Sequence, residues 1–187
     1  MGASTARDVA GYILDRLGPM ESWKVQKLTY YTQAWALAWE GQPVFDDRIE
    51  AWTNGPVTPS IWNAHRKQRW VTRLPGAHPD RLTPEQVDVV EAVLDFYGSC
   101  DGDTLSKMTH DEGPWQEARR GLSEGAWSDA EISQRSMRGF YTRATLTGAP
   151  VPTRRPSMHT ADPEQTIQHA QSEIERWHHT LDWLAVR

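Results

Sequence analysis

The segment VQKLTYYTQAWALAWEG, residues 25–41, constrains the fold more than any other part of the chain. Ser22 precedes it and Gly41-Gln42-Pro43 follows it, so the pattern predicts one helix of about five turns. On a helical wheel, apolar side chains cover most of the circumference and leave one narrow polar stripe: Gln26, Thr29, Gln33 and Glu40. A helix that is apolar nearly all round must be buried on several sides. We therefore predict that it lies at the centre of the domain.

Two lysines, Lys24 and Lys27, interrupt the apolar arc near the beginning of this helix. Their alkyl stems can lie on aromatic rings while the ammonium groups reach water. We therefore expect both ammonium groups to be solvated. Whether these lysines and the polar stripe also touch a partner is left open by the pattern.

Capping residues and 3.6-residue periodicity predict the other helices. They begin at Ser4 or Thr5, at Thr58-Pro59, at Thr83-Pro84, near Asp103, at Pro114, and at Ser128 with Glu131 as a capping box. RIEAW (48–52) and WVTRL (70–74) predict two short strands, which can pair with each other. The expected fold class is mainly α. It is a compact helical domain around a central buried helix, with a small two- or three-stranded sheet element and a long C-terminal helix.

The chain is predicted to consist of one domain and an appendage. Residues 1–146 form the domain, and residues 147–162, with several prolines and no periodicity, form a linker. Residues 163–187 form an amphipathic helix, whose apolar positions alternate in spacings of three and four: Ile167, Ala170, Ile174, Trp177, Leu181 and Leu184.

Composition limits the environment and the partners. There is one cysteine, Cys100, so an internal disulfide framework is excluded and a reducing compartment is favoured. No window resembles a membrane span or a signal peptide, and we expect a cytoplasmic protein without membrane contact. The net charge of −5 disfavours nucleic acid unless a local basic patch binds it.

Catalytic and cofactor motifs are absent from the pattern. The seven histidines are scattered without metal-ligand spacing, and there is no glycine-rich phosphate loop. His110 to Glu112 is the best acid/base cluster, but a polar helix end explains it more simply. We predict no catalytic residue, no metal site, no cofactor and no enzymatic activity, with a hydrolase around His110 as the alternative.

Two segments are candidates for binding. HRKQRWVTR places His65, Arg66, Lys67, Arg69 and Arg73 beside Trp62 and Trp70, which could hold phosphates and stack a base. A solvated helix face is the simpler interpretation. The C-terminal helix can fold back, dimerise or dock another protein, and its exposed tryptophans favour a partner, because aromatic anchors dominate interface energetics.

Four motifs together resemble the Panacea antitoxin domain, also called the phage-associated or SocA-like domain. They are VQKLTYYTQAWALAWEGQPVFDDRIEAWTNGPVTPSIWNAHR, LDFYG, LSKMTHDEGPWQEAR and ISQRSMRGFY, and the likeness covers about residues 6 to 142. The resemblance implies a cytoplasmic antitoxin of a bacterial or phage two-gene system, which neutralises its toxin by direct contact without catalysis. In some members the domain delivers the toxin to a AAA+ protease.

The resemblance also implies the partner, a cognate toxin encoded by an adjacent gene, without identifying it. Some relatives carry an N-terminal helix-turn-helix, for which residues 1 to 20 leave no room. We predict that the toxin contacts the C-terminal helix and the region around the beginning of the basic segment HRKQRWVTR. The predicted contact residues are Trp62, His65, Arg66, Ile174, Trp177, Leu181 and Leu184. A homo-oligomer, a proteolytic adaptor and a nucleic-acid-binding regulator stay as alternatives.

Overall fold

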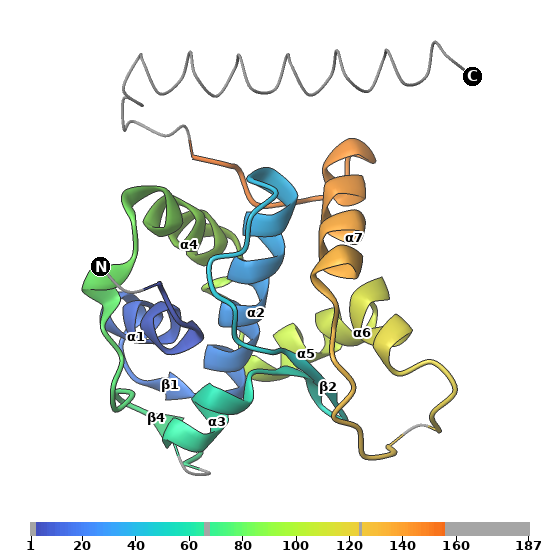
Figure 1. Cartoon of the computed structure of the whole chain (residues 1–187), viewed down its shortest axis with the longest axis horizontal. Helices are drawn as coiled ribbons and strands as arrows, with labels where there is room; N and C mark the ends of the chain where they lie inside the picture. The colour runs from blue at the N-terminus through green and yellow to red at the C-terminus, as the bar shows by residue number, and fades with distance from the viewer. Residues whose placement is uncertain (1–2, 66–67, 124, 156–187) are drawn as a thin grey trace. The chain divides into compact units, whose positions relative to one another are not determined.

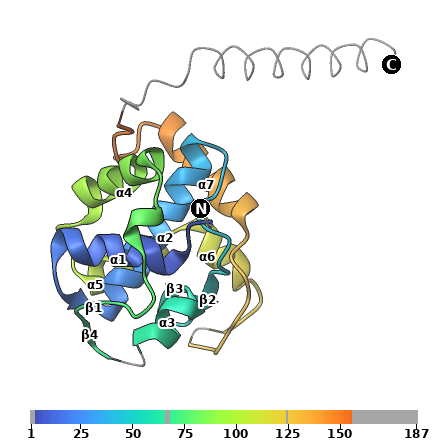
Figure 2. The same cartoon turned by 60° about the vertical axis from the view of Figure 1, so that its left-hand side comes forward.

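The computed structural model describes residues 3–65, 68–123 and 125–155, within a unit that spans Met1–Arg155. Helix α2 (Ser22–Trp39) runs through the middle of this unit. Four helices surround it: α1 (Ala6–Leu17), α4 (Pro84–Tyr97), α5 (Gly102–His110) and α7 (Gln134–Leu146) (Figures 1 and 2). The predicted central helix and the mainly helical fold class are both confirmed.

Short elements pack against these helices. They are α3 (Pro59–His65), α6 (Gly113–Ala118) and the 3₁₀ helix η1 (Pro79–Arg81). Two antiparallel strand pairs complete the described part: β1 (Met20–Glu21) with β4 (Trp70–Val71), and β2 (Glu50–Trp52) with β3 (Gly55–Val57). The predicted pairing of the two strands is therefore wrong. The NGP turn instead folds β2 back onto β3, and β4 pairs with the residues just before α2.

Helix starts follow the capping signals in most places. Thr5 and Thr83 each form a capping box, with Asp8 and Gln86 respectively. Ser22 is not the cap of α2, because Glu21 takes the N-cap position without a side-chain hydrogen bond.

The predicted capping box at Ser128 and Glu131 is also wrong, because α7 begins after Ser133. Residues 130–132 instead lie along β2, where the Ala51 amide donates to the Ala130 carbonyl (2.8 Å) and the Ile132 amide donates to the Ile49 carbonyl (2.9 Å). The backbone of this segment is thus satisfied by the small sheet and not by a helix.

The aromatic side chains of α2 form the core. Trp35 is 1% exposed, and its ring lies 5.0 Å from that of Tyr141 on α7. Tyr31 stacks on Tyr97 of α4 at 4.0 Å between ring centroids. The Trp35 indole N–H donates to the Tyr97 hydroxyl (3.3 Å), so the polar edge of the indole is satisfied inside the core.

Of the predicted polar stripe, Gln26, Thr29 and Gln33 face the interior, whereas Glu40, the C-cap of α2, is exposed. The Gln33 side chain accepts from the Val44 amide (2.8 Å) and donates to the Phe45 carbonyl (2.8 Å). The Gln26 side chain binds the Thr58 amide (2.8 Å) and carbonyl (3.4 Å) in the same way. The stripe thus fixes the loop after α2 and the beginning of α3, because unpaired buried backbone groups would be costly.

Lys27 is completely buried, so the expected solvation of its ammonium group is wrong. Its Nζ donates to the Pro56 carbonyl (3.1 Å). Gly55, at φ +96°, makes room for it, because a Cβ there would lie 2.7 Å from Lys27 Cε and 2.8 Å from Thr109 Oγ1. Burial lowers the pKa of Lys27 to about 7.

Residues 147–155, predicted as the beginning of the linker, belong to this unit, and the last five of them make contacts with it. Pro152 is buried, Arg154 pairs with Glu40 (2.7 Å), and Arg155 pairs with Asp95 (2.6 Å). The rest of the predicted linker and the C-terminal helix lie outside the described residues, so the division into three parts stays a prediction.

Candidate interaction surface

Three half-buried tryptophans gather where α2, β2 and α3 meet. Trp62 of α3 lies between the other two, with its ring centroid 5.4 Å from that of Trp52 and 6.4 Å from that of Trp23. We call Trp23, Trp52 and Trp62 the tryptophan cluster. It is a partly exposed aromatic surface over a buried layer that contains Lys27, whose Nζ lies 5.2 Å from the Trp23 ring centroid.

The central helix holds this cluster in place through the backbone beside it. Gln26 binds both backbone groups of Thr58, the residue before α3, and Lys27 binds the carbonyl of Pro56 in β3. The Trp52 carbonyl accepts from the indole N–H of Trp115 (2.9 Å), which joins α6 to the same region. The tryptophans are therefore presented by a rigid base of buried polar contacts.

Of the predicted contact residues, Trp62 and His65 lie together in this region. The two rings are edge to face with 5.1 Å between centroids, and His65 is 1% exposed. Neither ring nitrogen of His65 has a hydrogen-bond partner among the described residues, and burial lowers its pKa. His65 thus supports the Trp62 ring from beneath. Arg66, Ile174, Trp177, Leu181 and Leu184 lie outside the described residues, and their role stays a prediction.

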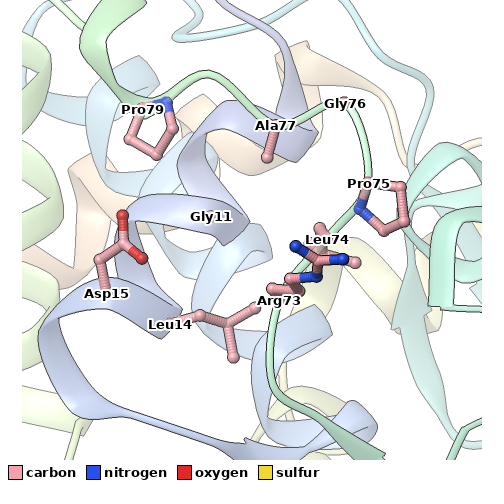
Figure 3. Close-up of a pocket in the computed structure, with 9 residues that line it drawn as sticks. All are labelled: Gly11, Leu14, Asp15, Arg73, Leu74, Pro75, Gly76, Ala77 and Pro79. Carbon is pink, nitrogen blue, oxygen red and sulfur yellow. The ribbon is translucent and has the colours of Figure 1, made fainter.

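Acidic groups from other parts of the chain lie near the two described arginines of the basic cluster, Arg69 and Arg73. Arg69 lies 3.6 Å from a carboxylate oxygen of Glu21. Arg73 lines a pocket of about 400 Å³ between α1 and the segment after β4, and Asp15 lines the same pocket (Figure 3). One arginine of the described part of this segment is therefore paired with a carboxylate, and the other shares a pocket with one.

His110 and Glu112, the two ends of the predicted acid/base cluster, lie in different environments. His110 stacks on Trp115 (4.2 Å) and lines a pocket of about 570 Å³ with Arg119. Glu112 turns to the aromatic core, where it accepts from the hydroxyls of Tyr141 (2.5 Å) and Tyr31 (3.2 Å). No hydrogen bond joins His110 to Glu112 in the structure as described here.

Arg119 shapes the pocket beside His110. The guanidinium group is buried over the Trp115 ring and donates to the carbonyls of Ala51 (2.9 Å) and Ala126 (2.6 Å). It thereby ties β2 to the loop after α6. Burial, followed by the charges of Lys27 and Arg119, lowers the pKa of His110.

Glu112 makes stability depend on pH below neutrality. Burial raises its pKa to about 7, from an ordinary value of 4.5, so the folded protein holds an extra proton between these values. The stabilisation of the folded state by this proton is fully present below pH 4.5 and is lost as the pH rises through 7. Glu112→Gln, which keeps an oxygen acceptor for the tyrosines, should remove on the order of 3 kcal/mol of this pH dependence. Urea unfolding at pH 5 and pH 7.5 measures it.

The matched control is Glu117→Gln, since Glu117 is an exposed carboxylate on the neighbouring helix. Its pH dependence should equal that of the parent protein. If the unfolding free energy of Glu112→Gln changed with pH as much as that of the parent protein, the Glu112 carboxylate would have to be solvated in the folded state.

The described residues contain no group of three or more histidine, cysteine or acidic side chains arranged to hold a metal ion. Among the same residues, no helix has the length and apolar character needed to cross a bilayer. Two features of the surface were not found from the sequence. One is the pair of exposed side chains at the rim of the loop after α6, Leu122 and Trp127. The other is an arginine-rich face of α7, which a helical wheel of residues 134–146 would have revealed.

Comparison with known proteins gives a match to a protein family. Residues 25–116 match the family model described as "Antitoxin SocA-like, Panacea domain". The match begins in α2 and ends in α6, and so it includes most of the central helix, the β2–β3 pair, and Trp52 and Trp62 of the tryptophan cluster. Strand β1 and Trp23 lie before it. Neither curated proteins nor solved structures give a match.

Proposed function

Because the chain belongs, over residues 25–116, to the antitoxin SocA-like Panacea domain family, we propose that it is an antitoxin that neutralises a cognate toxin by direct protein contact. The family match is the observation that carries the proposal. The toxin is encoded by the adjacent gene and the complex forms in the cytoplasm. The chain acts by binding and not by catalysis.

The tryptophan cluster is the part of the described surface best suited to hold the toxin. Tryptophan is enriched among residues that dominate binding energy, because a large ring buries much apolar area with few rotatable bonds. Trp62 has aromatic neighbours on three sides: Trp23, Trp52 and His65. The predicted contacts of Arg66 and of the C-terminal segment, Ile174, Trp177, Leu181 and Leu184, belong to the same proposal.

Co-expression with the neighbouring gene product tests the function. We expect growth to be rescued and the two proteins to co-purify, with the amount of toxin unchanged. A fall in toxin abundance that requires a AAA+ protease would instead indicate an adaptor. If the toxin stays active beside abundant folded chain, the antitoxin proposal is wrong.

Replacing Trp62 tests the proposed contact. Trp62→Ala should weaken the complex by about 30-fold or more, which corresponds to about 2 kcal/mol, the usual threshold for a dominant interface residue. The control is Trp70→Ala, because Trp70 is a more exposed tryptophan outside the cluster. Isothermal titration measures both affinities. Equal affinities for two variants that remain folded would place the contact elsewhere.

A further inference from the structure

The outer face of α7 is positively charged and has no partner within the described chain. Met137 and Tyr141 of this helix are buried against α2, each 1% exposed. The opposite side of the helix is exposed throughout: Arg135, Arg138, Gly139, Thr142, Arg143 and Leu146. We call these six residues the α7 outer face. The helix lies on the side of α2 away from α1 and β4 (Figure 1).

Charge is distributed unevenly between this helix and the rest of the chain. The net charge of the whole chain is −5, yet helix α7 contains three arginines and no aspartate or glutamate. Arg154 and Arg155, a few residues further on, pair with Glu40 and Asp95. Among the described residues, no carboxylate pairs with Arg135, Arg138 or Arg143. Three guanidinium groups thus remain open to a ligand.

Gly139 lies in the middle of this face. A Cβ built there would meet no atom within 4 Å, and its φ is not positive, so neither space nor backbone conformation within the described chain requires glycine. Glycine weakens a helix relative to alanine. Its useful property here is that a second backbone can approach closely. At 100° per residue, Leu146 falls within about 20° of Gly139, two turns further along the helix.

We propose that the α7 outer face binds an acidic helix of the partner protein, which crosses α7 at Gly139. This inference rests on the proposed function, since the partner is the toxin. Carboxylates of the partner helix pair with Arg135 and Arg143, one turn before and after the glycine. An apolar side chain of the partner covers Leu146, which is 81% exposed. The close approach and the apolar contact favour a protein helix over a phosphate backbone, which the acidic chain as a whole repels.

Charge reversal in the full-length chain tests the arginines. R135E/R143E should weaken the complex with the neighbouring gene product by about 30-fold or more, because each substitution replaces an attraction with a like-charge contact. The control is R81E/R120E, which makes the same change in net charge at two arginines that form no ion pair among the described residues. It should bind as the parent does, and both variants should keep the parent melting temperature, since all four side chains are exposed.

A size series at Gly139 tests the close approach. Gly139→Ala and Gly139→Gln should both melt no lower than the parent, because the added atoms meet nothing in the described chain. Gly139→Gln should nevertheless weaken the complex by about tenfold or more, and Gly139→Ala much less. A purely structural role of Gly139 would change the melting temperature and leave the affinity alone.

Three results would overturn the inference while leaving the proposed function intact. In the first, R135E/R143E and Gly139→Gln bind the neighbouring gene product as tightly as the parent does. In the second, a photo-crosslinker at Thr142 joins residues 156–187 of the same chain instead of the partner. In the third, R135E/R143E binds the partner normally but loses retention on duplex DNA. If the parent chain forms no complex at all, both the proposed function and this inference are wrong.

Discussion

Replacing Trp35 with alanine is expected to lower the free energy of unfolding by about 3 to 5 kcal/mol, as truncation of a large buried aromatic side chain generally does. Trp35 is 1% exposed at the centre of α2 and contacts Trp39, Tyr97 and Tyr141. Its removal leaves a cavity between α2, α4 and α7 and deprives the Tyr97 hydroxyl of a donor. Urea unfolding followed by circular dichroism measures the change.

The matched control is Trp127→Ala, because Trp127 is 75% exposed and should change the unfolding free energy little. Loss of neutralisation in Trp35→Ala should follow from unfolding alone. A Trp35→Ala protein that keeps the parent stability but no longer binds the toxin would place Trp35 in the interface and contradict its assignment to the core.

Lys27 provides the second large expected effect, a rise in stability with pH above neutrality. Burial lowers its pKa from 10.5 to about 7, so the unfolded chain holds more protons than the folded chain between these values. Stability should therefore rise with pH across this window and fall as pH decreases from 10.5 to 7. The whole rise attributable to this group is about 5 kcal/mol.

Lys27→Met keeps the length of the side chain and removes the titrating amine. The slope of unfolding free energy between pH 7 and pH 9.5 should largely disappear in this variant, whereas Lys107→Met, at an exposed position, should keep it. Measurements stay below pH 10, because buried tyrosines with raised pKa values add the opposite slope above it. A parent protein whose stability is flat across this range would show that Lys27 stays charged and hydrated.

The long helices could be predicted from the sequence because local signals and packing agree there. Thr5 and Thr83 cap their helices, and the periodic apolar positions of residues 84–97 face the core. The strands of two or three residues could not be paired from the sequence, since such short segments carry little register information and tertiary contacts decide their partners. Residues 130–132 show this most clearly, because they overlap the predicted capping box of Ser128 and Glu131 and yet lie along β2.

The helical-wheel pattern of α2 correctly predicted that the helix is central, but it did not predict that most of its polar side chains are buried. A polar stripe looks the same in the sequence whether it meets water or buried loop backbone. Gln26, Lys27 and Gln33 bind backbone groups of residues 44–58 that come far later in the chain, which no local pattern contains. Trp62 could be proposed for binding because it is a tryptophan in a basic segment. The burial of His65 beside it depends on tertiary contacts and could be seen only in the structure.

Reconstitution with purified proteins tests the central claim most directly. The full-length chain is titrated into the neighbouring gene product while the toxin's activity and the mass of the complex are followed. Direct neutralisation predicts that activity falls in proportion to a complex of fixed composition, without nucleotide or protease. Full toxin activity in the presence of excess folded chain, with no complex detected, would contradict the account.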